Sequence, residues 1–177
     1  MRDDDVGVRR VDGAEAAILA DALAEVLIDC VAGGAGVSFM WPLAHAKARA
    51  FWQGVADDVA RGERALIVAE DASGVIGTVQ LILALPENQP HRADVAKMLV
   101  HRRARRRGIG HRLLDALDAE ARREGRHVLV LDTVTGGDAE RLYARAGWHR
   151  VGEVPRYALM PDGAYSATTF FYKHLGA

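Results

Sequence analysis

Hydrophobic residues recur along the chain at every second position or at every third to fourth position, which are the spacings of strands and helices respectively. Glycines and prolines fall between these stretches, where they favour turns and helix ends. The predicted elements are a strand at 6–11, a helix at 14–31, a helix from Pro42 to Gly62, a hairpin of strands at 65–69 and 75–85, a strand at 94–100, a helix from the glycines at 108 and 110 to Gly125, a strand at 127–132, a short helix at 138–146, and antiparallel strands at 148–159 and 166–174.

The run at 127–132 is almost continuously apolar, which is typical of a central strand covered on both faces. We expect it to pair beside the strand at 94–100. Because the chain shows no long linker and no internal repeat, the sequence predicts a single domain over residues 1–177. A length of 177 residues and a hydrophobic content of 50% suit one globular unit with a full core.

Charge narrows the classes of function. The formal net charge is −1, so the arginines at 102–107 are a local feature, balanced by acids elsewhere that include Asp3, Asp4 and Asp5. Nucleic-acid-binding proteins usually have a broader basic surface, and we expect no nucleic-acid partner. No apolar run approaches about 20 residues, and the acidic N-terminus does not resemble a signal peptide. The sequence therefore predicts a cytoplasmic protein with no membrane partner.

Cys30 is the only cysteine, which excludes an intrachain disulfide and a zinc site built from cysteines. Because it lies beside Leu27 and Val31, we interpret it as a small core residue. The seven histidines form neither a metal-like pair nor a clear catalytic triad, so no metal is expected. We interpret His101 and His111 as surface residues.

The clearest chemistry lies at residues 100–110, VHRRARRRGIG, which follow an apolar strand and lead directly into a helix. In Arg105-x-x-Gly108-x-Gly110 the glycines leave no Cβ atom where a phosphate would approach the backbone. N–H groups at the start of the helix point at such an anion, and the arginines add positive charge. The stretch predicts a cradle for a pyrophosphate; a tight turn without a ligand is the alternative.

A second motif follows downstream, Ala139-x-x-Leu142-Tyr143-x-x-x-Gly147-Trp148. Together with the glycine loop, it resembles the GNAT superfamily of N-acetyltransferases, and the order of predicted elements extends the resemblance over the whole chain. The resemblance implies an α+β fold (the α/β GNAT fold), with a central mixed, mostly antiparallel sheet that contains two splayed parallel strands and is flanked by about four helices. It also implies acetyl-CoA as the cosubstrate and no metal.

The resemblance assigns roles to individual residues. Tyr143 would give a proton to the departing thiolate, although its helical spacing also places it in a core stripe, so a structural role stays open. Arg102 and Arg103 are either solvated charges or contacts to the 3′-phosphate of the cofactor. The residues that the resemblance implies in cofactor binding are Leu99, Val100, Arg105, Arg106, Arg107, Gly108, Ile109, Gly110 and His111.

A narrower resemblance is to the tabtoxin-resistance acetyltransferases, through residues 33–40 (GGAGVSFM) and 92–100 (RADVAKMLV). Two acids act at the acceptor amine in that group, and Asp94 and Asp132 fall at the matching positions. The match departs in two places. The first acid is aspartate instead of glutamate, and Gly136 stands where an asparagine is common in the wider superfamily. Each carboxylate has a structural alternative, as the cap of a loop or turn, and both alternatives stay open.

These features predict an enzyme that transfers acetyl from acetyl-CoA to the amine of a small molecule, with an amino-acid-like toxin or antibiotic as one candidate. Residues 33–41 and the hairpin around Tyr157 and Tyr165 are expected to close over the cleft, which suits a small acceptor. Asp94 and Asp132 are the candidates for the general base. The alternatives are an acyl-CoA-binding regulator without turnover and an acetyltransferase of protein or peptide amines. A homodimer is open as the oligomeric state.

Overall fold

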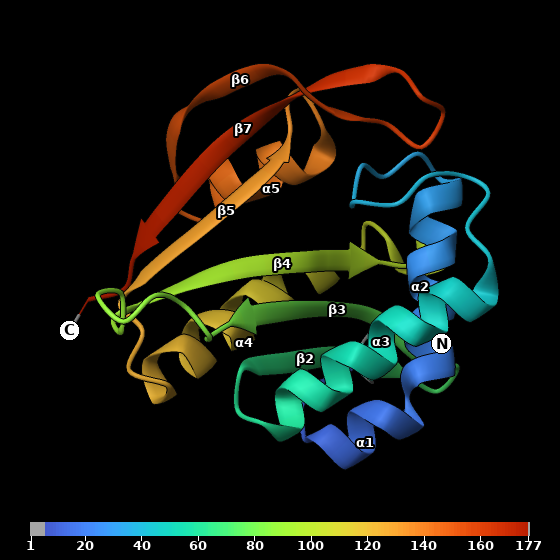
Figure 1. The fold of residues 1–177 in the computed structure, drawn as a ribbon, viewed down its shortest axis with the longest axis horizontal. Helices are drawn as coiled ribbons and strands as arrows, with labels where there is room; N and C mark the ends of the chain where they lie inside the picture. Colours follow the sequence, from blue (N-terminus) through green and yellow to red (C-terminus); the bar gives the residue numbers. More distant parts are fainter. Residues whose placement is uncertain (1–5, 177) are drawn as a thin grey trace.

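The computed structural model describes residues 6–176, and within them it contains one seven-stranded sheet in the order β1-β2-β3-β4-β5-β7-β6 (Figure 1). β4 and β5 run parallel, and every other neighbouring pair is antiparallel, as the sequence predicts. The acids at 3–5 lie outside the described residues. The strands are β1 (Gly7–Val11), β2 (Arg64–Asp71), β3 (Gly74–Ile82), β4 (Arg92–Val100), β5 (Val128–Val134), β6 (His149–Leu159) and β7 (Tyr165–His174).

Five α-helices and one 3-10 turn flank this sheet in the described part of the chain. They are α1 (Gly13–Ile18), α2 (Ala20–Ala32), α3 (His45–Ala60), the 3-10 turn η1 (Arg102–Ala104), α4 (Ile109–Arg123) and α5 (Asp138–Arg145). The boundaries predicted for the β2–β3 hairpin, for the end of α4 before Gly125 and for α5 agree with these to within a few residues, because turn residues mark each of them.

The single helix predicted at 14–31 is wrong: the structure has two helices, α1 and α2, that meet at Leu19. Asp12 caps α1, and its carboxylate accepts a hydrogen bond from a backbone N–H of the first turn at 2.8 Å. Both α1 and α2 pack against α3, but α2 also packs against β3 and β4 of the sheet, and the two helices run in different directions (Figure 1). These two packing directions cause the bend, which the hydrophobic spacing does not encode.

The next helix was predicted to begin at Pro42, and α3 begins only at His45. Between them Leu43 is buried among the residues of α2 and α3, so the chain enters the core before the helix starts. Packing of one loop side chain therefore delays the helix beyond the position that proline favours.

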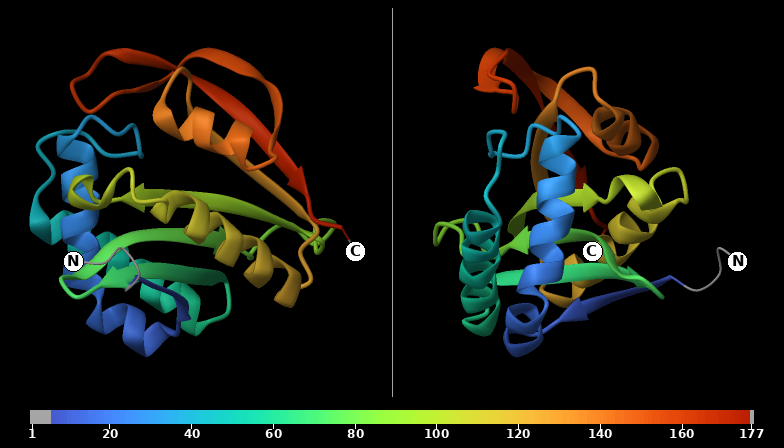
Figure 2. Two further views of the ribbon diagram at one scale, coloured as in Figure 1. Left: turned by 180° about the vertical axis from the view of Figure 1, so that it is seen from behind. Right: turned by 90° about the vertical axis from the view of Figure 1, so that its right-hand side faces the viewer.

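Two hydrophobic clusters lie on opposite faces of the sheet. One joins α2 and α3 to β2 and β3, with Trp52 and Leu66 among its members, and the other joins α4 and α5 to the sheet, with Leu117 and Phe171 (Figure 2). The prediction that β5 is covered on both faces is wrong. Its alternate residues Leu129 and Leu131 are buried, but Val128 and Val130 are half-buried and Asp132 is exposed, because α2 and α3 cover β2 to β4 and leave this face of β5 open.

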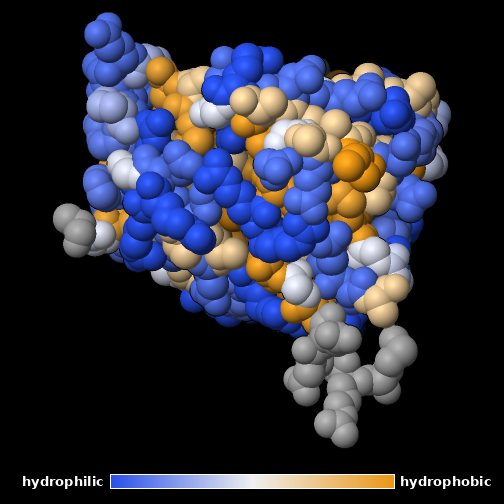
Figure 3. Space-filling model, turned by 90° about the horizontal axis from the view of Figure 1, so that it is seen from below, coloured by the Kyte–Doolittle hydropathy of each residue, from blue (hydrophilic) through white to orange (hydrophobic). Residues whose placement is uncertain are grey.

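The surface of the molecule is mainly hydrophilic on the face below the sheet. Seen from below, hydrophilic side chains cover most of the face and apolar ones are scattered between them (Figure 3). Within residues 6–176 no helix combines the length and the apolar character that crossing a membrane requires.

Candidate active site

The parallel pair β4 and β5 separates in the middle of the sheet. Their pairing extends over three positions, ending at Asp94 opposite Val130, and beyond that point β5 pairs only with β7. β4 also carries a bulge: between its pairs with Gln80 and Thr78 of β3 it contains one extra residue, and Lys97 there has a φ of +51°. The bulge and the divergence leave backbone groups of β4, up to Leu99 and Val100, without partners from β5.

The loop at the end of β4 has the geometry of an anion cradle. Gly108 has a φ of +73° and is the N-cap residue of α4. A Cβ at Gly108 would meet no atom within 4 Å, so the space above the backbone is open. The hydrogen bond from Arg112 N–H to Gly108 O is the first of the helix, and therefore the N–H groups of Ile109, Gly110 and His111 precede the helical ladder. This geometry fits a pyrophosphate.

Gly110 has a different role from the one predicted. A Cβ there would lie 2.9 Å from Leu142 Cδ2 of α5 and 3.7 Å from Met98 Cε of β4. The absence of a side chain therefore allows α5 to pack against the first turn of α4. The space above Gly108 is open and that above Gly110 is filled by Leu142, while contact of either glycine with a phosphate stays a prediction.

The arginines beside the loop divide into two groups. Arg102 donates from both its backbone N–H and its Nε to Asp29 of α2, at 2.8 and 2.9 Å, and Arg103 donates to Val75 O at 3.2 Å. Arg107 pairs with Asp71 in the β2–β3 turn at 3.0 Å. These contacts fasten the loop to its neighbours. Arg105 donates to Val100 O at 3.3 Å, and Arg106 is exposed at the same edge.

Cys30 and the loop histidine His101 both form hydrogen bonds with the backbone at the end of β4. Cys30 is buried in α2, its thiol donates to Val100 O at 3.5 Å, and burial raises its pKa. His101 accepts a hydrogen bond from the N–H of Arg103 at 3.2 Å, and burial lowers its pKa. Among the described residues, no group of three or more His, Cys, Asp and Glu side chains is arranged to hold a metal ion.

Tyr143 lies on the buried face of α5, with its ring 5.7 Å from that of Trp148 and 6.1 Å from that of Phe171. It is 4% exposed, so the core position expected from its spacing is confirmed. Burial raises the pKa of its hydroxyl, and the charge of Asp132 raises it further. The phenol is therefore neutral, and the influence of Asp132 places it close to the open end of β5.

Asp94 and Asp132 lie on the same face of the sheet, because Asp94 pairs with Val130 and Asp132 is two residues further along β5. Asp94 is half-buried and forms an ion pair with Arg92. Burial of its carboxyl raises the pKa of Asp132; Lys97 and a hydrogen bond from Thr168 lower it, and Asp94 raises it. The charge of Asp94 therefore contributes to the raised pKa of Asp132, but the loss of hydration has the larger effect.

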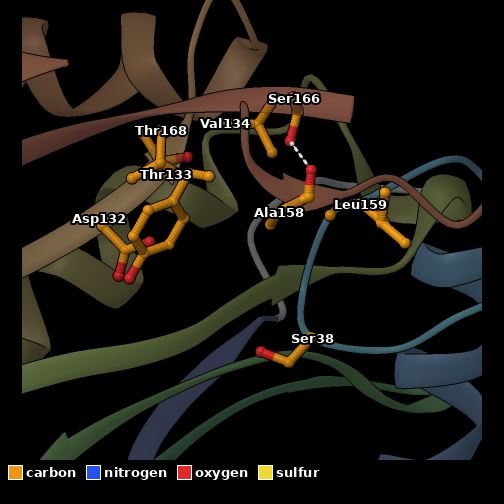
Figure 4. A pocket seen from close by; sticks show the side chains of 10 residues that line it. Ser38, Asp132, Thr133, Val134, Ala158, Leu159, Ser166 and Thr168 are labelled. Atoms are coloured by element: carbon orange, nitrogen blue, oxygen red, sulfur yellow. Dashed lines mark hydrogen bonds between the residues drawn. The ribbon is translucent and has the colours of Figure 1, made fainter. Parts of the chain in front are cut away.

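Asp132 lines a pocket of about 120 Å³ at the open face of β5 (Figure 4). Asp132 and Thr133 of β5 and Ser166 and Thr168 of β7 form one side, and Ser38 lies across from them on the loop between α2 and α3. The pocket is lined by Gly36, Ser38, Asp132, Thr133, Val134, Tyr157, Ala158, Leu159, Ser166 and Thr168. Asp94 is not among these residues, so the pocket contains one of the two predicted acids.

The loop after α2 meets the β6–β7 hairpin over this pocket. The N–H of Trp41 donates to Pro161 O at 3.1 Å, and a Cβ at Gly36 would lie 2.7 Å from Val134 Cγ2 and 3.2 Å from Met160 Sδ. The two segments that were expected to close over the cleft are thus in contact, and they bridge the separated halves of the sheet.

Lys97 is a residue of this site that the sequence analysis did not identify. Its ammonium lies 3.3 Å from Ser38 Oγ and 5.6 Å from the ring centre of Phe51, on the side of the sheet that carries Asp132. A signal was available, since Lys97 is the one charged residue between Val95 and Val100 of an otherwise apolar strand segment.

Comparisons with known proteins agree with this geometry. A family model described as an acetyltransferase (GNAT) domain matches residues 62–150. A curated protein from Azospirillum brasilense, described as an uncharacterized N-acetyltransferase in the hisH-hisA intergenic region, is 33% identical over 130 residues, which cover 72% of this chain and 75% of that protein.

Solved structures share the fold over almost the whole chain. A GCN5-related N-acetyltransferase from Kribbella flavida has a TM-score of 0.78 and 24% identity, covering 98% of this chain and 100% of its own. The ribosomal-protein-alanine N-acetyltransferase from Brucella melitensis has a TM-score of 0.77 and 24% identity, covering 96% and 99%. The acetyltransferase yncA from Salmonella typhimurium, solved with its cofactor acetyl-CoA, has a TM-score of 0.75 and 21% identity, covering 98% and 95%.

Proposed function

This chain belongs to the GNAT acetyltransferase family, and from that premise we propose that it transfers the acetyl group of acetyl-CoA to the amine of a small molecule. The observation that carries the proposal is the separation of β4 from β5 after Asp94, with the open cradle at Gly108 at the end of β4. Acetyl-CoA supplies the activated thioester. The residues proposed to hold it are the backbone of Leu99 and Val100 and the loop from Arg105 to His111.

The acceptor side supports a small molecule over a peptide. The pocket beside Asp132 is about 120 Å³ in volume, and the two segments joined by the hydrogen bond from Trp41 N–H to Pro161 O supply its lining residues Ser38 and Leu159. An extended peptide requires an open groove, whereas a bridged pocket encloses a small ligand. An amino-acid-like toxin or antibiotic, the acceptor type suggested by the resemblance to the tabtoxin-resistance group, is one candidate within this class.

The chemistry requires removal of a proton from the acceptor. An ordinary amine with a pKa near 10.4 is neutral in only roughly one molecule in 2,500 at neutral pH, and only the neutral amine attacks a carbonyl carbon. We assign Asp132 as the general base, directly or through water, because its carboxylate lines the pocket. Asp94 adds negative charge that attracts the ammonium form of the acceptor.

The opposite end of the reaction concerns the leaving thiolate and the acetyl oxygen. Backbone N–H groups of β4 near Leu99 and Val100, beyond the end of the β4–β5 pairing, are proposed to stabilise negative charge that develops on that oxygen. Tyr143, neutral and buried beside the open end of β5, is assigned as the donor of a proton to the sulfur. Asp132 thus accepts the proton of the amine, and Tyr143 donates the proton that the sulfur receives, so two separate groups handle the two protons.

The test is thiol release from acetyl-CoA across a panel of small amines, amino acids and antibiotics, compared with lysine-containing peptides and peptides with a free N-terminus. Turnover with small amines at rates well above those with peptides is expected. Preference for peptides would assign the protein to the peptide-modifying members of the family. Binding of acetyl-CoA with no turnover on any amine would support a non-catalytic, acyl-CoA-binding role. The cytoplasmic location stays a prediction.

Tyr143→Phe is expected to lower kcat about tenfold while acetyl-CoA affinity stays unchanged. The effect is moderate because a thiol with a pKa near 8.5 leaves without much help from an acid. The ring still fills its position against Trp148 and Phe171, so the melting temperature should change little. Steady-state kinetics combined with a binding titration separate the two quantities. A variant with the turnover of the native protein would leave Tyr143 with a packing role alone.

A further inference from the structure

The lysines of this chain differ sharply in their surroundings. The sequence contains three, Lys47, Lys97 and Lys173, in a chain whose other basic residues are arginines. Lys173 pairs with Asp118 at 2.6 Å. Lys47 is exposed on α3. Lys97 is half-buried, and among residues 6–176 no carboxylate lies within 4.0 Å of its ammonium. A cation placed there without an acid partner costs hydration free energy that the fold does not recover.

Aromatic rings and a hydroxyl fix the position of this ammonium. Lys97 Nζ lies 6.0 Å from the ring centre of Phe39 and 5.6 Å from that of Phe51. These two rings contact each other edge to face at 5.3 Å, and Ser38 Oγ is 3.3 Å from the ammonium. Ring faces attract a cation without neutralising its charge. These contacts hold the ammonium in place without neutralising it.

A second unpaired donor lies beside it on β3. Gln80 is fully buried and pairs with Ala96, the residue before Lys97, across the β3–β4 ladder. Its Oε1 accepts a hydrogen bond from Arg64 at 2.7 Å, which fixes the orientation of the amide, and its Nε2 has no partner. The charge of Arg64 also acts on Lys97. Arg64 is itself paired with Asp58 at 2.7 Å, so what this side adds to the charge of Lys97 is the unpaired donor of Gln80.

The location of this positive charge is unusual for an enzyme that binds amines. Lys97 lies close enough to Asp132, the proposed base, for each to shift the other's pKa. An acceptor that carried only an ammonium group would be attracted by Asp132 and repelled by Lys97. An acceptor that carries an ammonium and an anionic group close together would match both charges.

We propose that Lys97, held beside the Phe39–Phe51 pair, binds an anionic oxygen group of the acceptor, so that the small-molecule acceptor is an amine that also bears a carboxylate or a similar oxyanion. This inference rests on the proposed function and specifies its substrate class. Lys97 and Asp132 together then bind a zwitterionic acceptor, with its anionic group at the lysine and its amine at the aspartate. Charge pairing of this kind fixes the orientation of the amine toward the thioester.

The experiment compares matched acceptors and matched variants. Each amino acid of the panel is tested beside its carboxamide, for example L-leucine with L-leucinamide and L-glutamine with L-glutamine amide. Lys97→Met removes the charge and retains an apolar stem, and Lys97→Arg retains a charge that cannot be deprotonated in the protein. Lys47→Met is the matched control, because Lys47 Nζ also lies 6.0 Å from the ring centre of Phe39 but is exposed.

Native enzyme is expected to favour the carboxylate over the carboxamide. Lys97→Met should lower kcat/KM for the carboxylate about ten- to hundredfold, mainly through KM, and should change the carboxamide rate by a much smaller factor, which reports the altered pKa of Asp132. Lys97→Arg should retain most of the preference, and Lys47→Met should equal the native enzyme. An acetyl-CoA titration of each variant should give the native affinity.

Two outcomes would overturn the inference. Equal rates on the carboxylate and the carboxamide in native enzyme would show that no anionic group is read. An equal loss on both acceptors in Lys97→Met and in Lys97→Arg would show that Lys97 handles a proton instead. Both outcomes require turnover on small amines, so they differ from failure of the proposed function, in which acetyl-CoA binds and no small amine is acetylated.

Discussion

Gly108→Asp is expected to abolish the rise in melting temperature that acetyl-CoA produces in the native protein. A ligand that binds only the folded state stabilises it by an amount that grows with the logarithm of its affinity, and this raises the melting temperature. The new carboxylate would stand at the N-terminus of α4, beside the N–H groups of Ile109, Gly110 and His111. Repulsion of the pyrophosphate, together with occupation of the open space over Gly108, should weaken binding more than a hundredfold.

The variant also places aspartate at a φ of +73°, which by itself costs stability. Gly125→Asp is the matched control. Gly125 has a φ of +66°, a Cβ there would likewise meet nothing within 4 Å, and it follows the other end of the same helix. Both variants should melt at a lower temperature without ligand. Only Gly125→Asp should retain the rise in melting temperature that acetyl-CoA produces in the native protein. A normal shift in Gly108→Asp would refute the proposed cofactor site.

The elements that the sequence predicts well are those whose ends carry local signals. The β2–β3 hairpin turns at residues 71–74, where Asp71 accepts hydrogen bonds from Ser73 and Gly74 has a φ of +98°. Such turn chemistry is contained in four neighbouring residues and is therefore visible in the sequence. The α1–α2 bend at Leu19 depends on contacts with α3, which lies far along the chain, so no local pattern reports it.

The open face of β5 illustrates the same limit. An apolar run such as residues 127–132 is typical of a strand covered on both sides, yet coverage depends on where the helices stop. Here α2 and α3 cover the strands up to β4, and the half-exposed face of β5 becomes a wall of the pocket.

The sequence predicts the parts of the candidate site that lie in short local motifs, and it does not predict the parts that distant segments form together. The loop at 105–110 and the Tyr143 motif are short and local, so a resemblance to a family can identify them. The bulge at Lys97 results from the pairing of β4 with β3, and the contact between Trp41 and Pro161 joins segments separated by 120 positions of the chain. Features built from distant segments require the three-dimensional structure.

The charges of Asp132 and Lys97 influence each other. Loss of hydration raises the pKa of Asp132 and lowers that of Lys97, which disfavours both charges, and the charge of each group partly offsets this effect on the other. Removing either charge changes the state of the other. Single substitutions at these positions are therefore expected to be non-additive, as for residues that act as a unit.

Asp132→Asn is expected to lower kcat by on the order of a hundred- to ten-thousandfold, because the amide cannot accept the proton of the acceptor amine. The folded protein should not lose stability at pH 7. The pKa of Asp132 in the folded protein is raised above its unfolded value. Ionisation of this acid therefore begins to oppose folding as the pH rises above the unfolded pKa, and the cost is complete above the folded pKa. The neutral amide removes this cost. A native melting temperature combined with lost turnover would separate catalysis from folding.

The pH profile gives an independent signature. In the native enzyme the rate should fall as the pH decreases through the raised pKa of Asp132, because the base becomes protonated. In Asp132→Asn that limb should be absent, and the rate should follow only the titration of the acceptor. The difference between the two enzymes should be widest near neutral pH and should narrow as the pH approaches about 10, where the free amine becomes abundant.

Asp94→Asn is the control for charge at this face. Asp94 is paired with Arg92 and does not line the pocket, so its loss should lower kcat/KM by a smaller factor and leave the acidic limb in place. The double variant should lose less than the product of the two single effects. If Asp94→Asn removes the acidic limb and Asp132→Asn retains it, the base is Asp94, and the pocket at Asp132 serves only to bind the acceptor.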